Sequence, residues 1–153
     1  MSANRFVFLL AAFVLIPLGM LAQQKYVPTP NEELYGTWVN TVDLMPQERI
    51  VTASGIRQFL HTTDTETQFD ATLIIDSKWV DSEGRICYKT HGTETSGYFK
   101  GSNWQGLERV SKDGKVYEST WVSTGRNAFN PQNYPGKIDP KEPEYRLYYR
   151  TQE

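Results

Sequence analysis

The polar residues most capable of chemistry lie in the last segment of the chain. Arg146, Tyr148 and Arg150 are spaced two apart, so in a β-strand they share one face. A guanidinium beside a phenol can receive a carboxylate through charge-assisted and O–H hydrogen bonds. Alternatively, one of the two arginines stacks on Trp38, near the other end of the chain, and caps the core by a cation–π contact. The sequence leaves both roles open.

Metal binding is the next chemistry to weigh. The soft or imidazole ligands in the sequence are His61, His91 and Cys87. Cys87 and His91 lie four apart in a predicted strand, which separates them by about 13 Å, too far to share an ion. We therefore expect no metal site and no cofactor. Both histidines are interpreted as ordinary polar strand positions, and Cys87 as a small buried thiol.

Catalytic motifs are missing from the sequence. It contains no Gly-x-Ser-x-Gly elbow, and no glycine-rich phosphate loop precedes a helix. Glu108 falls on the same predicted strand face as Trp104 and Val110. It either enters a pocket or lies in water at a barrel rim, and we expect the rim. We therefore predict a binding or structural protein rather than an enzyme.

The first 22 residues have the layout of a secretory signal peptide. Met1 to Arg5 carries one positive charge, Phe6 to Ile16 is an unbroken apolar run, and Ala22 offers a small residue for cleavage before Gln23. The apolar run is shorter than the ~20 residues of a spanning helix. We predict an exported protein, periplasmic or secreted, with membrane anchoring only if the signal stays uncleaved.

The composition of the chain restricts its expected partners and the way in which its fold can be stabilised. The 16 basic and 18 acidic residues give a net charge of −2 and form no basic stripe, so we expect no nucleic-acid partner. A single cysteine excludes an intramolecular disulfide, so a hydrophobic core must stabilise the fold. The predicted organisation is a signal peptide (1–22), a polar N-terminal arm (23–33) and one β-barrel domain (34–153).

From Tyr35 onward the sequence is typical of a β protein, with β-branched and aromatic residues and frequent turn residues. The clearest hairpin turns at Asp113-Gly114, for which we predict a type I′ turn. That register places Arg109 opposite Glu118 and Gly106 opposite Trp121. The hairpin face expected to point inward carries Trp104, Val110, Tyr117 and Trp121. Strands are predicted at 35–43, 49–52, 56–61, 72–80, 85–91, 96–100, 104–111, 116–123 and 144–151.

These eight or nine strands need no crossover helix, so we predict an all-β fold: a single antiparallel meander closed into a barrel. Closure pairs the first strand with the last and brings Trp38 to Arg146 or Arg150. The long segment Thr124–Pro143 contains four prolines and no periodicity. We expect it to form an ordered loop over one mouth of the barrel, with an aromatic residue, Phe129 or Tyr134, turned inward.

Gly36-x-Trp38 at the start of the meander, with an arginine in the final strand, resembles the calycin superfamily, chiefly its lipocalin-like domains. The segment Trp79–Lys89 also looks like the central hairpin of small exported lipocalin-like proteins of bacteria, a group that supplies no activity. The ending Arg146–Arg150 is similar to the Arg-x-Tyr ending of intracellular fatty-acid-binding proteins. In that family the two side chains hold a fatty-acid carboxylate.

We therefore expect a lipocalin-like protein that binds a small apolar or amphipathic ligand, hydrophobic or carboxylate-bearing, in its barrel. The expected lining or capping residues are Trp38, Trp104, Trp121, Arg146 and Tyr148. The alternative is a cell-envelope interaction or structural module whose barrel is filled by its own side chains. A less expected reading is an enzyme on the same scaffold, such as an isomerase or lyase acting on a lipid. A cavity of ~300 Å³ or more would indicate a hollow barrel.

Overall fold

A computed structural model of the protein describes residues 25–40, 47–61 and 66–151. The predicted signal peptide, Met1–Ala22, and its junction with Gln23 lie outside these ranges. The described residues form nine strands and one 3-10 turn, η1 (Pro131–Asn133). No helix in these ranges is long and apolar enough to cross a membrane. The strands are β1 (Gly36–Asn40), β2 (Gln47–Thr52), β3 (Gly55–His61), β4 (Glu66–Ala71), β5 (Ile74–Val80), β6 (Ile86–Thr93), β7 (Asn103–Val110), β8 (Val116–Gly125) and β9 (Arg146–Arg150).

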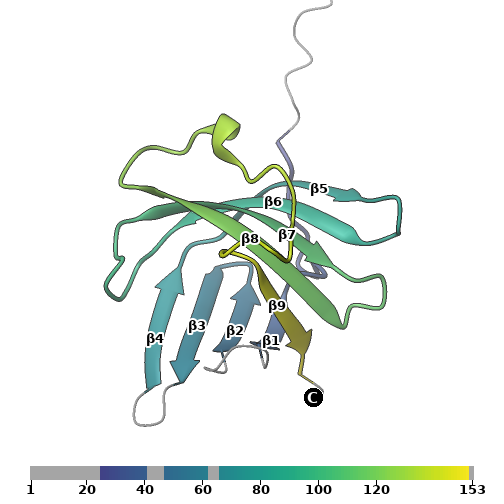
Figure 1. Ribbon diagram of the computed structural model, residues 1–153, viewed down its shortest axis with the longest axis horizontal. Coiled ribbons are helices and arrows are strands. Elements are labelled where there is room, and N and C mark those ends of the chain that lie inside the picture. The colour runs from purple at the N-terminus through teal and green to yellow at the C-terminus, as the bar shows by residue number, and fades with distance from the viewer. Residues whose placement is uncertain (1–24, 41–46, 62–65, 152–153) are drawn as a thin grey trace, which may run out of the picture.

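The strands form one antiparallel sheet in the order β4-β3-β2-β1-β9-β8-β7-β6-β5. The all-β prediction is confirmed, and so is the pairing of the first strand with the last, in which Trp38 lies opposite Arg150. The sheet curls so that β5–β8 cross over a second leaf made of β1–β4 and β9 (Figure 1).

The prediction of a fully closed barrel is wrong, because the two end strands, β4 and β5, do not pair. The segment that follows β6 takes the place beside β4. Ala71 forms a β-bridge with Glu94, and the backbone N–H of Thr95 donates to the carbonyl of Asp70 at 2.7 Å. The backbone hydrogen bonds of this end of β4 are thus satisfied without β5, and the sheet remains an open half-barrel.

The β7–β8 hairpin has the predicted register, with Arg109 opposite Glu118 and Gly106 opposite Trp121. Its turn is not type I′, since no non-glycine residue in the described chain has positive φ. Instead, the N–H of Gly114 donates to the Ser111 carbonyl at 2.8 Å, and Gly114 alone is left-handed, with φ 71°. A turn with glycine in its fourth position preserves the same pairing.

Two strand predictions fail at the sheet edge. The segment 96–100 is part of a turn that contains Gly97 and Gly101, both at positive φ. The strand β4 was not expected, because its sequence is mostly polar and exposed. Polar, charged edge strands are common because they discourage pairing with other chains, so such strands carry a weak apolar signal.

Trp38 is fully buried, and the guanidinium carbon of Arg150 lies 4.1 Å from its ring centroid, so the predicted cap is confirmed. Arg150 also donates to the carbonyls of Gly114 at 2.7 Å, Tyr35 at 3.0 Å and Glu33 at 2.7 Å. A Cβ on Gly36 would lie 2.4 Å from Arg150 Nη1, which explains the glycine of the Gly-x-Trp motif. The cap therefore closes one end of the half-barrel.

The N-terminal arm seals the same end. Glu32 is 3% exposed, and Lys78 Nζ donates to Glu32 at 2.8 Å and to Glu33 at 2.6 Å. Tyr26 OH and the backbone N–H of Thr29 both donate to Glu32 at 2.7 Å. These bonds from Lys78, Thr29 and Tyr26 outweigh the opposing effect of burial and lower the pKa of Glu32 to about 2.

The segment between β8 and β9 covers the outer face of the β5–β8 leaf (Figure 1). His91 points away from the interior, and Phe129 stacks on it at 4.1 Å between ring centroids. Tyr134 OH donates a hydrogen bond to Asp76. The same carboxylate is also hydrogen-bonded to His91, with 2.6 Å between Asp76 Oδ2 and His91 Nδ1. The prediction that Phe129 or Tyr134 turns inward over a mouth is therefore wrong. Leu107 is also buried on this outer face of the leaf.

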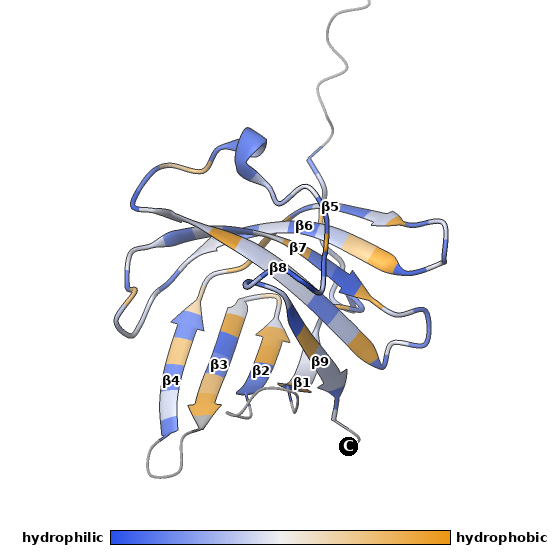
Figure 2. Cartoon of the chain, viewed as in Figure 1, coloured by the Kyte–Doolittle hydropathy of each residue, from blue (hydrophilic) through white to orange (hydrophobic). Residues whose placement is uncertain are grey.

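Apolar residues alternate with polar ones along the strands, and the connections are mainly hydrophilic (Figure 2). The apolar positions form one core between the two leaves. It fills the half of the barrel next to the Trp38–Arg150 cap. Its fully buried members are Leu34, Trp38, Val51, Tyr88, Val110, Tyr117 and Tyr148.

Candidate functional site: a pocket in the open half of the barrel

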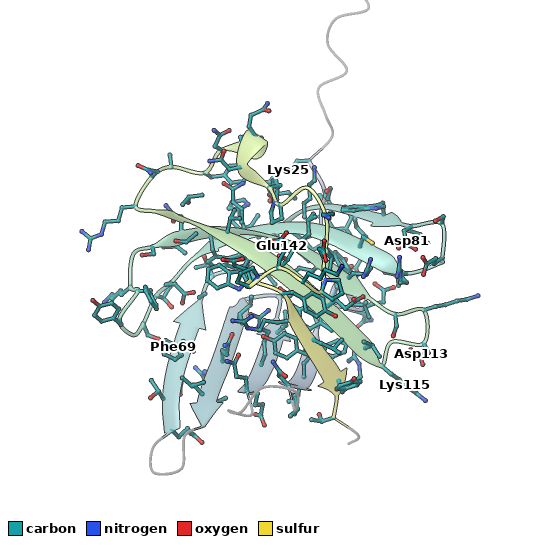
Figure 3. The ribbon with its side chains drawn as sticks, in the orientation of Figure 1. Lys25, Phe69, Asp81, Asp113, Lys115 and Glu142 are labelled. Carbon is teal, nitrogen blue, oxygen red and sulfur yellow. The ribbon has the colours of Figure 1, made fainter. Side chains whose placement is uncertain are left out.

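The half of the barrel away from the cap holds a pocket of about 210 Å³. This volume is smaller than the ~300 Å³ expected of a hollow barrel, so the interior is partly filled and partly open. Side chains crowd the space between the leaves, and Phe69 lies at the β4 side, away from Asp113 and Lys115 in the β7–β8 turn (Figure 3). The pocket is lined by Gln47, Arg49, Ile56, Gln58, Phe69, Ala71, Glu94, Phe99, Trp104, Glu108, Ser119, Trp121, Arg146 and Tyr148.

A chain of hydrogen bonds joins two buried charges beside this pocket. Arg49 Nη1 donates to Tyr117 OH at 2.7 Å, and Tyr117 OH donates to Glu108 Oε2 at 2.6 Å. Thr90 donates to the other Glu108 oxygen at 3.2 Å. Arg49 is 8% exposed and Glu108 2% exposed. The guanidinium of Arg49 also lies over the ring of Tyr148, 4.9 Å from its centroid.

Burial has the largest effect on the pKa values of the groups in this chain of hydrogen bonds. It raises the pKa of Glu108, although Arg49 and the hydrogen bond from Tyr117 oppose the rise. It also raises the pKa of Tyr117 well above its usual range. Burying a charge costs several kcal/mol even when it is paired. Buried ionisable groups beside a pocket are therefore candidates for a functional role rather than for a purely stabilising one.

Two further polar groups of the pocket have no partner within the described residues. Trp104 is 8% exposed, and its buried Nε1 has no hydrogen-bond acceptor there. The side chain of Glu94 lines the pocket and makes no hydrogen bond or ion pair in these ranges. Burial raises the pKa of Glu94, and Arg49 partly opposes the rise. The indole nitrogen is closed to solvent within the wall of the pocket, whereas the Glu94 side chain is partly exposed.

Four of the five ligand residues predicted from sequence, Trp104, Trp121, Arg146 and Tyr148, line this pocket. Trp38 does not line it, because it lies in the filled half under the cap. Only one nitrogen of Arg146 makes these bonds: Nη1 donates to the carbonyls of Pro143 and Tyr145, each at 2.7 Å.

The expectation that Glu108 lies in water at a rim is wrong. Glu108 occupies the middle of β7, opposite Ser119 on one side and Tyr88 on the other. Gly106 leaves room for its carboxylate, since a Cβ there would lie 2.9 Å from Glu108 Oε1. Central strand positions on an inner face are buried, which is why this carboxylate lies beside the pocket.

Sequence reasoning missed Arg49 and Glu94. The signal for Arg49 was its alternation with Gln47 and Val51 along β2, but the neighbouring Ile50 made the inner face ambiguous. No periodic signal marks Glu94, which follows β6 in the turn that bridges to β4.

Metal binding has no support in the ranges described, which hold no group of three or more His, Cys, Asp or Glu side chains placed for an ion. Cys87 is buried, with its sulfur 3.9 Å from Asp81 Oδ2. His91 belongs to the contact with the outer segment. Neither residue lines the pocket.

Comparisons with known proteins give no match: no family model, curated protein or solved structure is significantly similar to this chain. Function is therefore inferred from the pocket itself.

Proposed function

We propose that this protein is an exported binding protein of calycin type that holds one small amphipathic molecule in the open half of its barrel. The observation that carries the proposal is the unfilled space of about 210 Å³ between the two leaves, which is lined by aromatic side chains together with a few charged and polar ones. Binding sites for small molecules typically combine such an apolar, aromatic wall with a few polar groups that orient the ligand.

Burial of Arg49 and Glu108 beside the same pocket supports this proposal. A barrel that served only as a structural module could be filled with apolar side chains, which stabilise at least as well as buried charges. The carboxylate-bearing ligand expected from Arg146 and Tyr148 is the competing candidate. It depends on Nε and Nη2 of Arg146, because Nη1 already donates to two backbone carbonyls.

The calycin assignment is part of the proposal. It is supported by the pairing of β1 with β9 and by the Arg150 cap over Trp38, both located where the Gly-x-Trp resemblance implies. Export is supported by the layout of Met1–Ala22. Fold resemblance does not identify a ligand, so the ligand must be sought by experiment.

The test is ligand-detected NMR with a library of small aromatic and amphipathic compounds, on the wild type, Trp104→Phe and Trp79→Phe. Trp79 is 41% exposed and does not line the pocket, so it is a matched control. We expect one bound molecule per chain and a roughly 2- to 13-fold weaker affinity in Trp104→Phe, corresponding to the loss of about 0.5–1.5 kcal/mol of ring packing against the ligand. The control should bind as the wild type does. Absence of binding by every compound, or equal weakening in both variants, would contradict the proposal.

A further inference from the structure

A second cavity, of about 180 Å³, lies next to the pocket. Its lining includes His91 and Gly92 of β6, Gln105 of β7 and Phe129 of the segment between β8 and β9. We call this cavity the outer chamber and the pocket in the open half of the barrel the inner chamber. Among the described residues, Trp104 is the one that lines both. We propose that Trp104 determines ligand size, because its indole separates two chambers of one binding cavity and limits the ligand to a single ring. This inference rests on the binding function proposed above.

The two chambers meet where the half-barrel is open, at the connection between β4 and β5. Ala71 lines the inner chamber, and the next residue, Thr72, lines the outer chamber. In the same way, Glu94 lines the inner chamber and Thr93 the outer one. The backbone N–H of Thr72 donates to the Thr93 carbonyl at 2.9 Å. One side of the boundary is therefore hydrogen-bonded backbone, which no side-chain substitution removes.

The indole of Trp104 forms the other side of the boundary. Trp104 lies opposite Gly92 in the β6–β7 pairing. A Cβ on Gly92 would lie 2.8 Å from Trp104 Cζ2 and closer still to the carbonyl oxygen of Thr72, so the ring packs where these two outer-chamber residues meet. Trp104 also belongs to the core between the two leaves and is 8% exposed. The ring therefore reaches the wall of the outer chamber from the core side, and it is the part of the boundary that a substitution can remove.

The volumes of the chambers set what each can hold. A cavity of ~150 Å³ holds benzene, so the inner chamber of about 210 Å³ and the outer chamber of about 180 Å³ each have room for one six-membered ring. Two linked rings need ~300 Å³ by the same measure. Neither chamber alone provides this space, but the two together do. With the indole of Trp104 in place, only a ligand with one ring is enclosed completely.

Contacts from the segment between β8 and β9 make His91 a reporter of the outer chamber. Phe129 stacks on the imidazole of His91, with 4.1 Å between ring centroids. Gln105 Nε2 donates to the Asn130 carbonyl at 2.7 Å, and the Asn130 N–H donates back to Gln105 Oε1 at 3.3 Å. These contacts hold the segment over the chamber. A ligand ring that enters the outer chamber therefore lies close to the His91–Phe129 pair.

Phenol and 4-phenylphenol test the proposal, because they share a hydroxyl group and differ by one linked ring. Isothermal titration gives the ratio of 4-phenylphenol affinity to phenol affinity in the wild type, Trp104→Ala and Trp121→Ala. Trp121 lines the inner chamber and not the outer one, so it is the matched control. The ratio should rise at least about tenfold in Trp104→Ala. That factor, about 1.4 kcal/mol, is at the lower end of the energy gained by burying a phenyl side chain.

The imidazole signals in a proton–carbon NMR spectrum show where the second ring lies. The protein has two histidines, so the His91 signal is simple to assign. Addition of 4-phenylphenol should shift the His91 signal in Trp104→Ala but not in the wild type or in Trp121→Ala. Trp104→Leu, which retains more apolar contact with the core, is measured in parallel and should show the same shift. The wild-type measurement does not depend on how well any variant folds.

Two results would overturn the role of Trp104 and leave the binding function standing. One is an equal rise of the affinity ratio in Trp104→Ala and Trp121→Ala without a shift of the His91 signal. The other is a shift of the His91 signal when phenol or 4-phenylphenol binds the wild type, because the chambers would then be connected already. If neither compound binds the wild type or any variant, the proposed binding function fails together with this inference.

Discussion

Replacing Arg150 by Met tests the cap that defines one end of the half-barrel. Methionine keeps an apolar stem over Trp38 but loses the guanidinium. Three part-buried hydrogen bonds to backbone carbonyls disappear, at about 1 kcal/mol each, together with a cation–π contact of about 0.5–2 kcal/mol. We therefore expect the free energy of unfolding to fall by about 3.5–5 kcal/mol.

Urea unfolding followed by tryptophan fluorescence measures this change, provided that the slope of the transition is unaltered. Arg146→Met is the matched control on the same strand. Arg146 makes its bonds to Pro143 and Tyr145 close to the solvent-exposed end of β9, so its loss should cost less than about 1 kcal/mol. Equal destabilisation by the two substitutions would refute the view that Arg150 holds the first and last strands together.

Three further predictions concern the N-terminal arm, the buried carboxylate and export. The pKa of Glu32 is lowered from 4.5 to about 2 in the folded protein, so its contribution of up to about 3 kcal/mol to stability is present above pH 4.5 and is lost as the pH falls to 2. The difference in unfolding free energy between wild type and Glu32→Gln should therefore shrink between pH 4.5 and 2. A constant difference would disprove the role of Lys78 and its neighbours. Burial raises the pKa of Glu108, so its protonated form stabilises the fold below pH 4.5 and this contribution is lost as the pH rises. Denaturation between pH 4.5 and 8 should show the wild type losing stability relative to Glu108→Gln. Parallel stability curves for the two proteins would count against a desolvated carboxylate. Mass spectrometry of native protein should find a mature chain beginning at or near Gln23, whereas intact Met1 in soluble cytoplasmic material would rule out export.

The sequence predicted the parts of the fold that depend on local pattern. The β7–β8 register follows from alternation on both sides of Asp113-Gly114. The pairing of Trp38 with a C-terminal arginine follows from barrel topology, although only the structure distinguishes Arg150 from Arg146. The opening between β4 and β5 could not be predicted, because it arises from hydrogen bonds between Asp70 and the chain after β6, and no sequence pattern records that contact.

The site was predicted in part for a similar reason. Aromatic residues at inward strand positions, such as Trp104, are expected in a barrel interior. Arg49 and Glu94 contradict the apolar pattern on which such predictions depend, so they became visible only when the inner face was known. The segment carrying Phe129 and Tyr134 was placed over the wrong surface, because both faces of the β5–β8 leaf carry apolar residues that need cover.

Binding of a small molecule in the open half of the barrel is tested most directly in the indole N–H region of a proton–nitrogen NMR spectrum, during titration with a compound that the ligand-detected screen identifies. The protein has four tryptophans, so four indole signals report on different parts of the molecule. We predict that the signals of Trp104 and Trp121 move most, because both side chains line the pocket. The signals of Trp38, under the Arg150 cap, and of Trp79, on β5, should stay in place. A saturating amount of that compound that leaves the Trp104 and Trp121 signals unmoved, or that shifts Trp38 or Trp79 instead, would contradict a binding site in the open half of the barrel.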